Sequence, residues 1–223
     1  MKHTLSILIF FSFIFNASYA QDESPEGKDP KAKAVLDEIA KKTEALDNLQ
    51  LKFHYQIINN QTKQTQSYKG HAFIKGNKYK LIIPALEIIS DGNSVWTYQK
   101  EVREVSIQKA EPEDESIFNP AKLYTIYKRG FKYQYLGKHS RDGMNLAIID
   151  LYPEQPGKKS FTRVRVEADT DKNRIISFTT FGKDGIDYVV EFSDFKPNIK
   201  IPDGFFTFNE EKYPDDTEVI DMR

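Results

Sequence analysis

The feature that most constrains the fold is the stretch from Ile88 to Ile107, which reads IISDGNSVWTYQKEVREVSI. An apolar run ends at Ser90, and Asp91-Gly92 supplies the positive-φ positions that a tight turn needs. Two further runs with alternating apolar residues follow, separated by a short polar turn. Three strands this close together leave no room for crossover helices, so the stretch predicts an antiparallel meander.

The start of the chain predicts a secretory signal peptide. A short basic segment precedes an apolar core from Leu5 to Phe15, and Ser18-Tyr19-Ala20 places small residues at a cleavage site. A transmembrane helix needs about 20 apolar residues, and this core is shorter. We therefore expect residues 1–20 to be removed and residues 21–29 to form a flexible leader. Because no Cys follows the apolar core, we do not expect the exported protein to be a lipoprotein itself.

Charge and cysteine content narrow the classes of function. The full chain has 32 basic and 33 acidic residues, and removal of residues 1–20 takes away only Lys2, which leaves a net charge of 31 − 33 = −2. A nucleic-acid-binding protein would need a basic patch, so we expect no nucleic-acid partner. The absence of Cys excludes thiol catalysis and zinc–cysteine sites. It also suits a Gram-negative periplasm better than a disulfide-stapled secreted module.

Two amphipathic helices are predicted. Asp29-Pro30 provides an N-cap followed by proline at N1, and apolar residues from Val35 to Leu46 recur at helical spacing. Asn119-Pro120 repeats the cap-and-proline pattern before a shorter helix with Leu123 and Ile126 on one side.

Elsewhere the apolar period is two, which is typical of half-buried strands. Alternation is clear at residues 49–57, 65–75 and 79–83 and in the meander, and it resumes in five strands after Phe131. Because strands twist, a meander of about ten or eleven strands should curl strongly. We predict a mainly β (α+β) single domain over residues 30–223, an open or half-closed antiparallel barrel with the helices over its mouth. The period leaves open whether the interior is packed or hollow.

Signatures of catalysis are missing. The sequence contains no G-x-S-x-G, no glycine-rich phosphate loop and no H-E-x-x-H, so we expect no enzyme activity and no cofactor. His54 and His71 could face each other across the first hairpin, but two histidines without a third ligand are usually surface residues, so no metal is expected. The acidic run from Glu111 to Glu115 is interpreted as a solvated loop, which a basic partner surface could still use.

Aromatic residues on the predicted strand faces allow two interpretations. They could form an ordinary β core, or they could line a cavity for an apolar ligand, as in small barrels that bind such ligands. Composition leaves both open. The residues concerned are Tyr55, Tyr68, Tyr79, Trp96, Tyr98, Phe131, Tyr133 and Tyr135.

Several short motifs follow one another along the chain, and the most specific is Ser90-Asp91-Gly92-x-x-Val95-Trp96-x-Tyr98. The others are Leu46-Asp47-Asn48-Leu49 at the end of the first helix, Gly70-His71-Ala72-Phe73-Ile74-Lys75, Tyr79-x-Leu81, Asn119-Pro120, Phe206-Thr207-Phe208 and Thr217-Glu218-Val219-Ile220-Asp221. Together they span essentially the whole mature chain, and their order resembles the LolA family of periplasmic lipoprotein carriers.

This resemblance implies an unclosed β-barrel with a helical lid over a hydrophobic cavity that accepts the acyl chains of outer-membrane lipoproteins. It implies a non-enzymatic carrier in a Gram-negative periplasm. The carrier would take its cargo from an inner-membrane ABC-type release complex and deliver it to an outer-membrane acceptor. We assume a monomer. A periplasmic binder or sensor of another apolar lipid on the same scaffold remains an alternative.

The resemblance also suggests which residues would contact lipid. The expected lipid-binding residues are Phe53, Tyr55, Tyr79, Leu81, Ile83, Trp96, Tyr98, Leu123 and Ile126. One departure concerns the lid. The family's strand end reads Lys-Arg-Pro, and its arginine holds the lid closed, whereas this chain has Lys75-Gly76-Asn77 followed by Lys78. Lys78 is the candidate lid latch, although a lysine lacks the forked donor geometry of arginine. This departure from the family pattern is the reason for considering another apolar lipid as the ligand.

Overall fold

A computed structural model describes residues 25–110, 119–202 and 204–223. The predicted signal peptide and the acidic run at 111–115 lie outside these residues, and the leader is described from residue 25 onward. Both the signal peptide and the solvated loop therefore stay predictions. Every helix within the described ranges is too short or too polar to span a bilayer.

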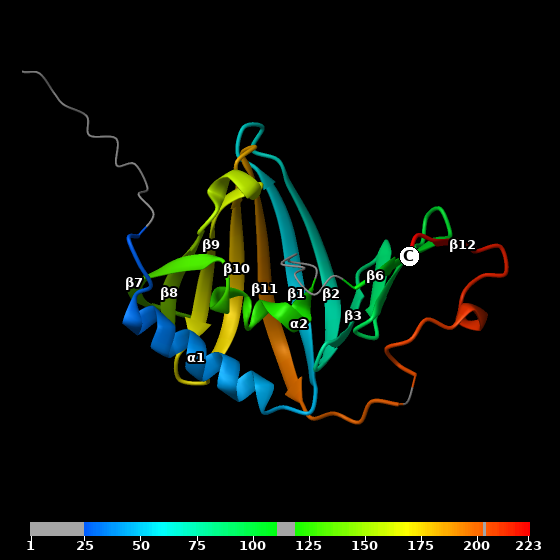
Figure 1. The fold of residues 1–223 in the computed structure, drawn as a ribbon, viewed down its shortest axis with the longest axis horizontal. Coiled ribbons are helices and arrows are strands. Elements are labelled where there is room, and N and C mark those ends of the chain that lie inside the picture. The colour runs from blue at the N-terminus through cyan, green and yellow to red at the C-terminus, as the bar shows by residue number, and fades with distance from the viewer. Residues whose placement is uncertain (1–24, 111–118, 203) are drawn as a thin grey trace, which may run out of the picture.

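One twelve-stranded sheet forms the body of the protein (Figure 1). Its strand order is β12-β6-β5-β4-β3-β2-β1-β11-β10-β9-β8-β7. All neighbours are antiparallel except β12 and β6, which are parallel. The strands are β1 (Leu49–Asn59), β2 (Thr65–Lys75), β3 (Lys78–Ile82), β4 (Leu86–Ser90), β5 (Ser94–Gln99), β6 (Glu104–Lys109), β7 (Phe131–Arg141), β8 (Met144–Pro153), β9 (Phe161–Asp169), β10 (Arg174–Gly182), β11 (Ile186–Pro197) and β12 (Glu218–Asp221).

The mainly β class and the central meander, which forms β4, β5 and β6, are confirmed, but the strong curl is wrong. The sheet is neither closed nor strongly curled. Each face has a cover of its own: helix α1 (Pro30–Glu44) packs on one face, and the segment after β11 packs on the other near β5 and β6. Burial therefore does not require the sheet to roll up on itself. Strand β12 was not predicted, because it lies in a polar tail.

Helix α1 begins where the sequence predicts. The Asp29 carboxylate accepts hydrogen bonds from the backbone N–H groups of Lys31 (2.7 Å) and Ala32 (3.2 Å), which satisfies the exposed donors of the first turn. The apolar stripe, including Leu36 and Ile39, is buried in the main core. Figure 1 shows α1 crossing the ends of β7 to β11.

The second helix is shorter than expected. Helix α2 spans Pro120–Leu123 and is followed by a 3-10 turn, η1 (Ile126–Lys128). Within the described residues, the Asn119 side chain makes no capping hydrogen bond to α2. Two further 3-10 turns, η2 (Pro156–Lys158) and η3 (Glu210–Lys212), lie at the surface. A four-residue helix contributes little stability by itself, so α2 depends on its packing against the sheet.

The register between strands assigns each side chain to a face. Cross-strand partners point to the same side of a sheet, and successive residues point to opposite sides. Leu81 pairs with Ile88, and Ile88 pairs with Thr97. These residues point to the side that α1 covers, which we call the inner face. Trp96 and Tyr98 flank Thr97 along β5 and therefore point to the opposite side, the outer face.

Candidate functional site

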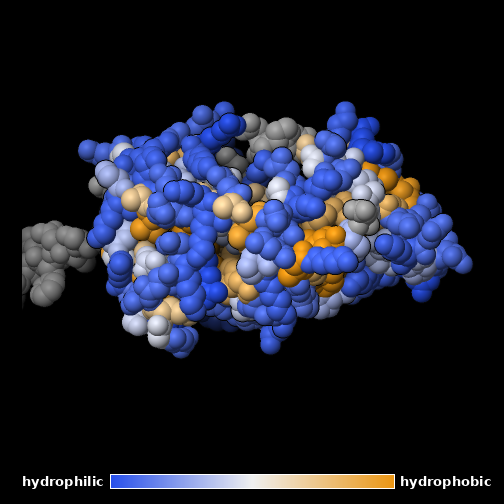
Figure 2. All heavy atoms as spheres, turned by 90° about the horizontal axis from the view of Figure 1, so that it is seen from below, coloured by the Kyte–Doolittle hydropathy of each residue, from blue (hydrophilic) through white to orange (hydrophobic). Residues whose placement is uncertain are grey.

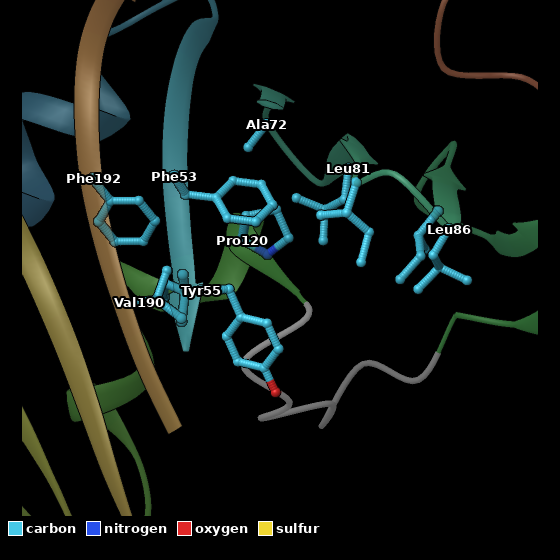
Figure 3. A pocket seen from close by; sticks show the side chains of 11 residues that line it. Phe53, Tyr55, Ala72, Leu81, Leu86, Pro120, Val190 and Phe192 are labelled. Carbon is cyan, nitrogen blue, oxygen red and sulfur yellow. The ribbon is translucent and has the colours of Figure 1, made fainter. Parts of the chain in front are cut away.

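An apolar cleft opens on the inner face between β1, β2, β3, β11 and α2 (Figure 3). Eleven described residues line it; ten of their side chains carry no polar atom, and the exception is Tyr55. The lining residues are Phe53, Tyr55, Ala72, Leu81, Ile83, Leu86, Ile88, Pro120, Leu123, Val190 and Phe192. A surface of this composition offers hydrocarbon a dry contact and offers an ionic substrate no partner.

Gly70 on β2 leaves room for its neighbours at the wall of the cleft. A Cβ at this position would lie 2.5 Å from the Phe53 ring, 2.5 Å from the backbone oxygen of Ile82 and 2.7 Å from the Ile83 side chain. The missing side chain therefore lets β3 and the Phe53 ring approach β2. This explains the glycine at this point of the strand, where another backbone approaches closely.

The cleft is narrow. The free space between its walls is about 540 Å³ including the open mouth, but only about 40 Å³ is wide enough for the centre of a water molecule. In the close-up view, Phe192 and Val190 lie on one side of the lining and Leu81 and Leu86 on the other, with Phe53 and Pro120 between them (Figure 3). An acyl chain would therefore have to push these side chains or α2 aside in order to enter.

A second hollow lies on the other side of α2. Ala121, Lys122 and Tyr124 border it from α2, and Gly76 and Asn77 border it from the β2–β3 turn. About 250 Å³ of it is wide enough for the centre of a water molecule. Helix α2 thus lies between an apolar cleft and a wider, more polar hollow.

Two residues at this helix carry buried polar atoms. The Tyr124 hydroxyl and Asn119 Oδ1 have no hydrogen-bond partner among the described residues. Burial raises the pKa of Tyr124 well above the ordinary tyrosine range, so its hydroxyl stays protonated. Unsatisfied buried groups of this kind cost free energy, so they do not add to the stability of the packed position of α2.

Five of the expected lipid-binding residues lie together in the cleft: Phe53, Tyr55, Leu81, Ile83 and Leu123. Tyr79 is buried in the main core, and Ile126 packs against the same core, both outside the cleft lining. Lys78 is exposed and pairs with Lys75 at the β2–β3 turn, which borders the second hollow. Its role as a latch remains a prediction.

Trp96 and Tyr98 belong to a second, smaller core on the outer face. There Tyr98, Val105 and Ile107 are buried with Trp96, Phe208 and Tyr213 packed against them. The rings of Tyr98 and Tyr213 meet edge to face at 4.7 Å, and the Tyr213 hydroxyl donates to Glu87 at 2.6 Å. The two residues of the most specific sequence motif therefore support the C-terminal segment and do not line the cleft.

Sequence reasoning missed the wall that β11 contributes. Val190 and Phe192 line the cleft, and both Tyr55 and Phe53 pair with them directly across β1 and β11. Ile186, Tyr188, Val190 and Phe192 alternate clearly in the sequence, so the buried face of β11 was visible. Its position beside β1 was not, because these strands are more than 120 residues apart.

The histidines do not form a pair. His54 lies opposite Lys69, and His71 lies opposite Lys52, so the two rings are diagonal neighbours on the outer face. A ring nitrogen of His54 lies 2.6 Å from the Ser67 hydroxyl. In the part of the chain that the structure describes, no three His, Cys, Asp or Glu side chains come together in a way that could hold a metal ion.

Comparison with known proteins supplies the family. The model of the outer membrane lipoprotein carrier protein LolA family matches residues 43–209, well over half of the chain. An uncharacterized protein of Methanocaldococcus jannaschii is 27% identical over 181 residues, which cover 77% of this chain. This chain spans about half the length of that relative, as the match covers 50% of it.

Solved structures that are similar to this one have low sequence identity to it. An uncharacterized conserved protein from Thermus thermophilus has a TM-score of 0.58 and 10% identity, with 86% of this chain and 99% of that chain covered. A LolA superfamily protein from Nitrosomonas europaea has a TM-score of 0.44 and 15% identity, with 79% and 97% covered.

The family match also indicates the functional class of the protein. LolA-like proteins form a superfamily that binds lipoproteins and lipids, and the carriers in it are not enzymes. Membership indicates a protein that acts outside the cytoplasm. On the evidence of the family model, which covers the sheet from β1 to β11, this chain belongs to the LolA family of outer membrane lipoprotein carrier proteins.

Proposed function

We propose that the protein is a periplasmic carrier that binds the acyl chains of lipoproteins released from the inner membrane and shuttles them to the outer membrane. The observation that carries the proposal is the cleft on the inner face, in which Tyr55 is the one lining residue with a polar side-chain atom among the residues that the structure describes. An acyl chain in water loses about 0.8 kcal/mol of favourable burial for each CH₂ group, so the cargo needs such a surface during transit.

Release requires that binding remain reversible. Helix α2 places Pro120 and Leu123 over the cleft, has four residues and lies beside two unsatisfied buried groups. These features suit a cover that moves at low cost. We keep Lys78 as the candidate latch, because its turn borders the hollow on the far side of α2.

The partners follow from this role. The proposed cargo is an acylated outer-membrane lipoprotein, the donor is an inner-membrane ABC-type release complex, and the recipient is an outer-membrane acceptor. We further propose that residues 30–223 act as one domain, as a monomer in a Gram-negative periplasm after removal of residues 1–20.

The width of the cleft favours a second candidate. A space that admits so little water accommodates one slender chain more readily than several. A periplasmic binder or sensor of a single-chain apolar lipid is therefore the alternative. Native mass spectrometry of the protein from its own host separates the two: a bound small lipid without lipoprotein supports the alternative, and a co-purified acylated lipoprotein supports the carrier.

A matched pair of neighbouring substitutions tests the carrier. Ile83 lines the cleft, whereas Ile82 points to the outer face. Ile83→Glu places a charge in the cleft and should lower the release of a triacylated lipoprotein from inner-membrane vesicles at least about tenfold, whereas Ile82→Glu should leave it near the wild-type level. If wild-type protein releases no lipoprotein in the presence of the release complex, or if both variants release as much as wild type, the carrier proposal is wrong.

A further inference from the structure

Three tyrosines lie side by side at one end of the cleft. Tyr68, Tyr55 and Tyr188 come from the adjacent strands β2, β1 and β11. The ring centroids of Tyr55 and Tyr68 are 6.3 Å apart, and those of Tyr55 and Tyr188 are 6.4 Å apart, with both pairs stacked. This tyrosine ladder lies nearer the β1–β2 and β10–β11 turns than Phe53 does, so it marks the end of the cleft that points away from α1.

The ladder belongs to the inner face. Tyr55 pairs with Val190, and Val190 lines the cleft. Tyr188 is two residues before Val190 on the same strand, so it points to the same side. Figure 3 shows the Tyr55 hydroxyl at the far end of the side chain, directed away from Phe53 and Leu81. The cleft is thus apolar toward α2 and bears hydroxyl groups toward the turns.

Thr180 adds a fourth hydroxyl beside the tyrosine ladder. Thr180 on β10 pairs with Tyr188, so it shares the inner face. Its side chain is 7% exposed, and its Oγ1 has no hydrogen-bond partner in the described part of the chain. A buried hydroxyl without a partner costs free energy, and stacking of the tyrosine rings gives no reason for it. A ligand that accepts a hydrogen bond would remove this cost.

The surroundings indicate the kind of acceptor. In the described part of the chain, the side chains that flank the four hydroxyls on the inner face are neutral, and Tyr68 donates to one of them, Gln66 Oε1, at 3.3 Å. The flanking residues are Ile57, Gln66, Val164 and Ile186. The nearby arginines, Arg163 and Arg165, point to the outer face, where both lie against Asp150. Among these described neighbours, no cation on the inner face could pair with a phosphate. The hydroxyl groups can, however, donate hydrogen bonds to an uncharged carbonyl.

We propose that Tyr55, Tyr188 and Thr180 form the polar end of the ligand site and donate hydrogen bonds to the ester carbonyls of an acyl lipid whose chains lie along Phe53 and Leu81. The inference rests on the proposed function, because it assumes that the cleft takes acyl chains. It adds the direction in which the lipid lies and the group that the protein recognises. Tyrosine suits such a place, because its ring contacts hydrocarbon while its hydroxyl bonds a polar group.

The test compares two lipids that differ in the acceptor alone. A diacylglycerol and the dialkyl ether with the same chain lengths compete for the purified protein with a fluorescent alkyl probe. Wild type should bind the ester about tenfold more tightly, as one or two additional hydrogen bonds provide. The triple variant Tyr55→Phe, Tyr188→Phe, Thr180→Val keeps the rings and the shape of each side chain, and it should bind both lipids with the affinity that wild type has for the ether.

Tyr213→Phe is the matched control, because it removes a phenolic hydroxyl on the outer face and should leave the ester-to-ether ratio unchanged. A wild-type ratio near one, or a triple variant that loses affinity for both lipids in parallel, would overturn the role of the ladder and leave the carrier proposal standing. If neither lipid displaces the probe from wild type, the proposed function fails and this inference fails with it.

Discussion

Gly70 is the residue on which the approach of β3 to the cleft wall most directly depends. Because a Cβ there would lie within 2.7 Å of three atoms, Gly70→Ala must shift either the Phe53 ring or the β3 backbone. Overpacking of this kind costs about 1–3 kcal/mol. We expect urea unfolding to show a loss in that range, together with weaker binding of an apolar probe.

Gly157→Ala provides the control for Gly70. A Cβ at residue 157 meets nothing within 4 Å, so this exposed position should tolerate the same change within about 0.5 kcal/mol. Equal stability of the two alanine variants would contradict the close approach at Gly70.

Asp29 makes a pH-dependent contribution to stability. The backbone N–H of Tyr135 donates to Oδ2 at 3.1 Å and, together with the N–H groups of Lys31 and Ala32, holds the pKa of Asp29 below its ordinary value of 3.8, against a smaller opposing effect of burial. A carboxylate with a lowered pKa stabilises the folded state above its unfolded pKa, and this stabilisation is lost as the pH falls through the lower folded value.

Asp29→Asn therefore provides a clear comparison. Asparagine is also a good N-cap but does not titrate. The advantage of wild type over Asp29→Asn should be constant above about pH 5 and should shrink as the pH falls below the ordinary Asp pKa, as measured by thermal unfolding at a series of pH values. An advantage that grows on acidification would show that the carboxylate is not stabilised by these N–H groups.

At the scale of secondary-structure elements, a buried ion pair joins strands β8 and β9. Asp150 is 1% exposed and accepts two hydrogen bonds from its cross-strand partner Arg165, at 2.7 and 2.8 Å, while Arg163 Nε lies 3.2 Å away. Removal of one member of such a pair leaves uncompensated charge. Asp150→Ala should cost about 3 kcal/mol in denaturant unfolding.

An exposed ion pair supplies the comparison for Asp150. Arg103 and Asp216 pair at the surface, where both side chains are more than half exposed. Asp216→Ala should change the free energy of unfolding by less than about 1 kcal/mol, because water screens such a pair. A similar loss in the two variants would mean that burial of Asp150 does not strengthen its bonds.

At the scale of the whole molecule, the described residues form two separate apolar cores, one on each face of the sheet. The larger joins α1 and η1 to the inner face, and the smaller holds the C-terminal segment on the outer face. Figure 1 shows this segment running from the end of β11 past β3 to β12 at the far edge. Seen from below, the surface between α1 and this segment is largely hydrophilic and carries separate apolar patches (Figure 2). Helix α1 and the C-terminal segment therefore cover different parts of the sheet.

Because the two cores lie on opposite faces, we can predict how tryptophan fluorescence responds to lipid. Trp96 is the single tryptophan of the chain and lies in the outer core. Occupation of the cleft should leave its emission maximum unchanged, whereas a tryptophan introduced by Phe53→Trp in a Trp96→Phe background should shift to shorter wavelength when lipid binds. A lipid-dependent shift of Trp96 in the wild type would place a binding surface on the outer face.

The sequence by itself determined most of the elements. The Asp29-Pro30 cap, the period-two runs and the turn at Asp91-Gly92 depend on interactions between near neighbours, and α1 and strands β1 to β11 follow from them. Five residues of the cleft were also predictable, because they lie on the buried sides of strands or of α2.

Only the tertiary structure decided which face each alternating strand presents to α1 and which strands are neighbours. Alternation separates the two sides of one strand but says nothing of their orientation relative to the next strand, and a shift of one residue exchanges them. Such shifts occur between Gln50 and Lys52 and between Tyr135 and Gly137. For this reason Trp96 and Tyr98 could be assigned to a strand from the sequence but to the outer face only from the pairing of Ile88 with Thr97. The pairing of β1 with β11 and of β6 with β12 likewise joins segments distant in the chain, which no local pattern encodes.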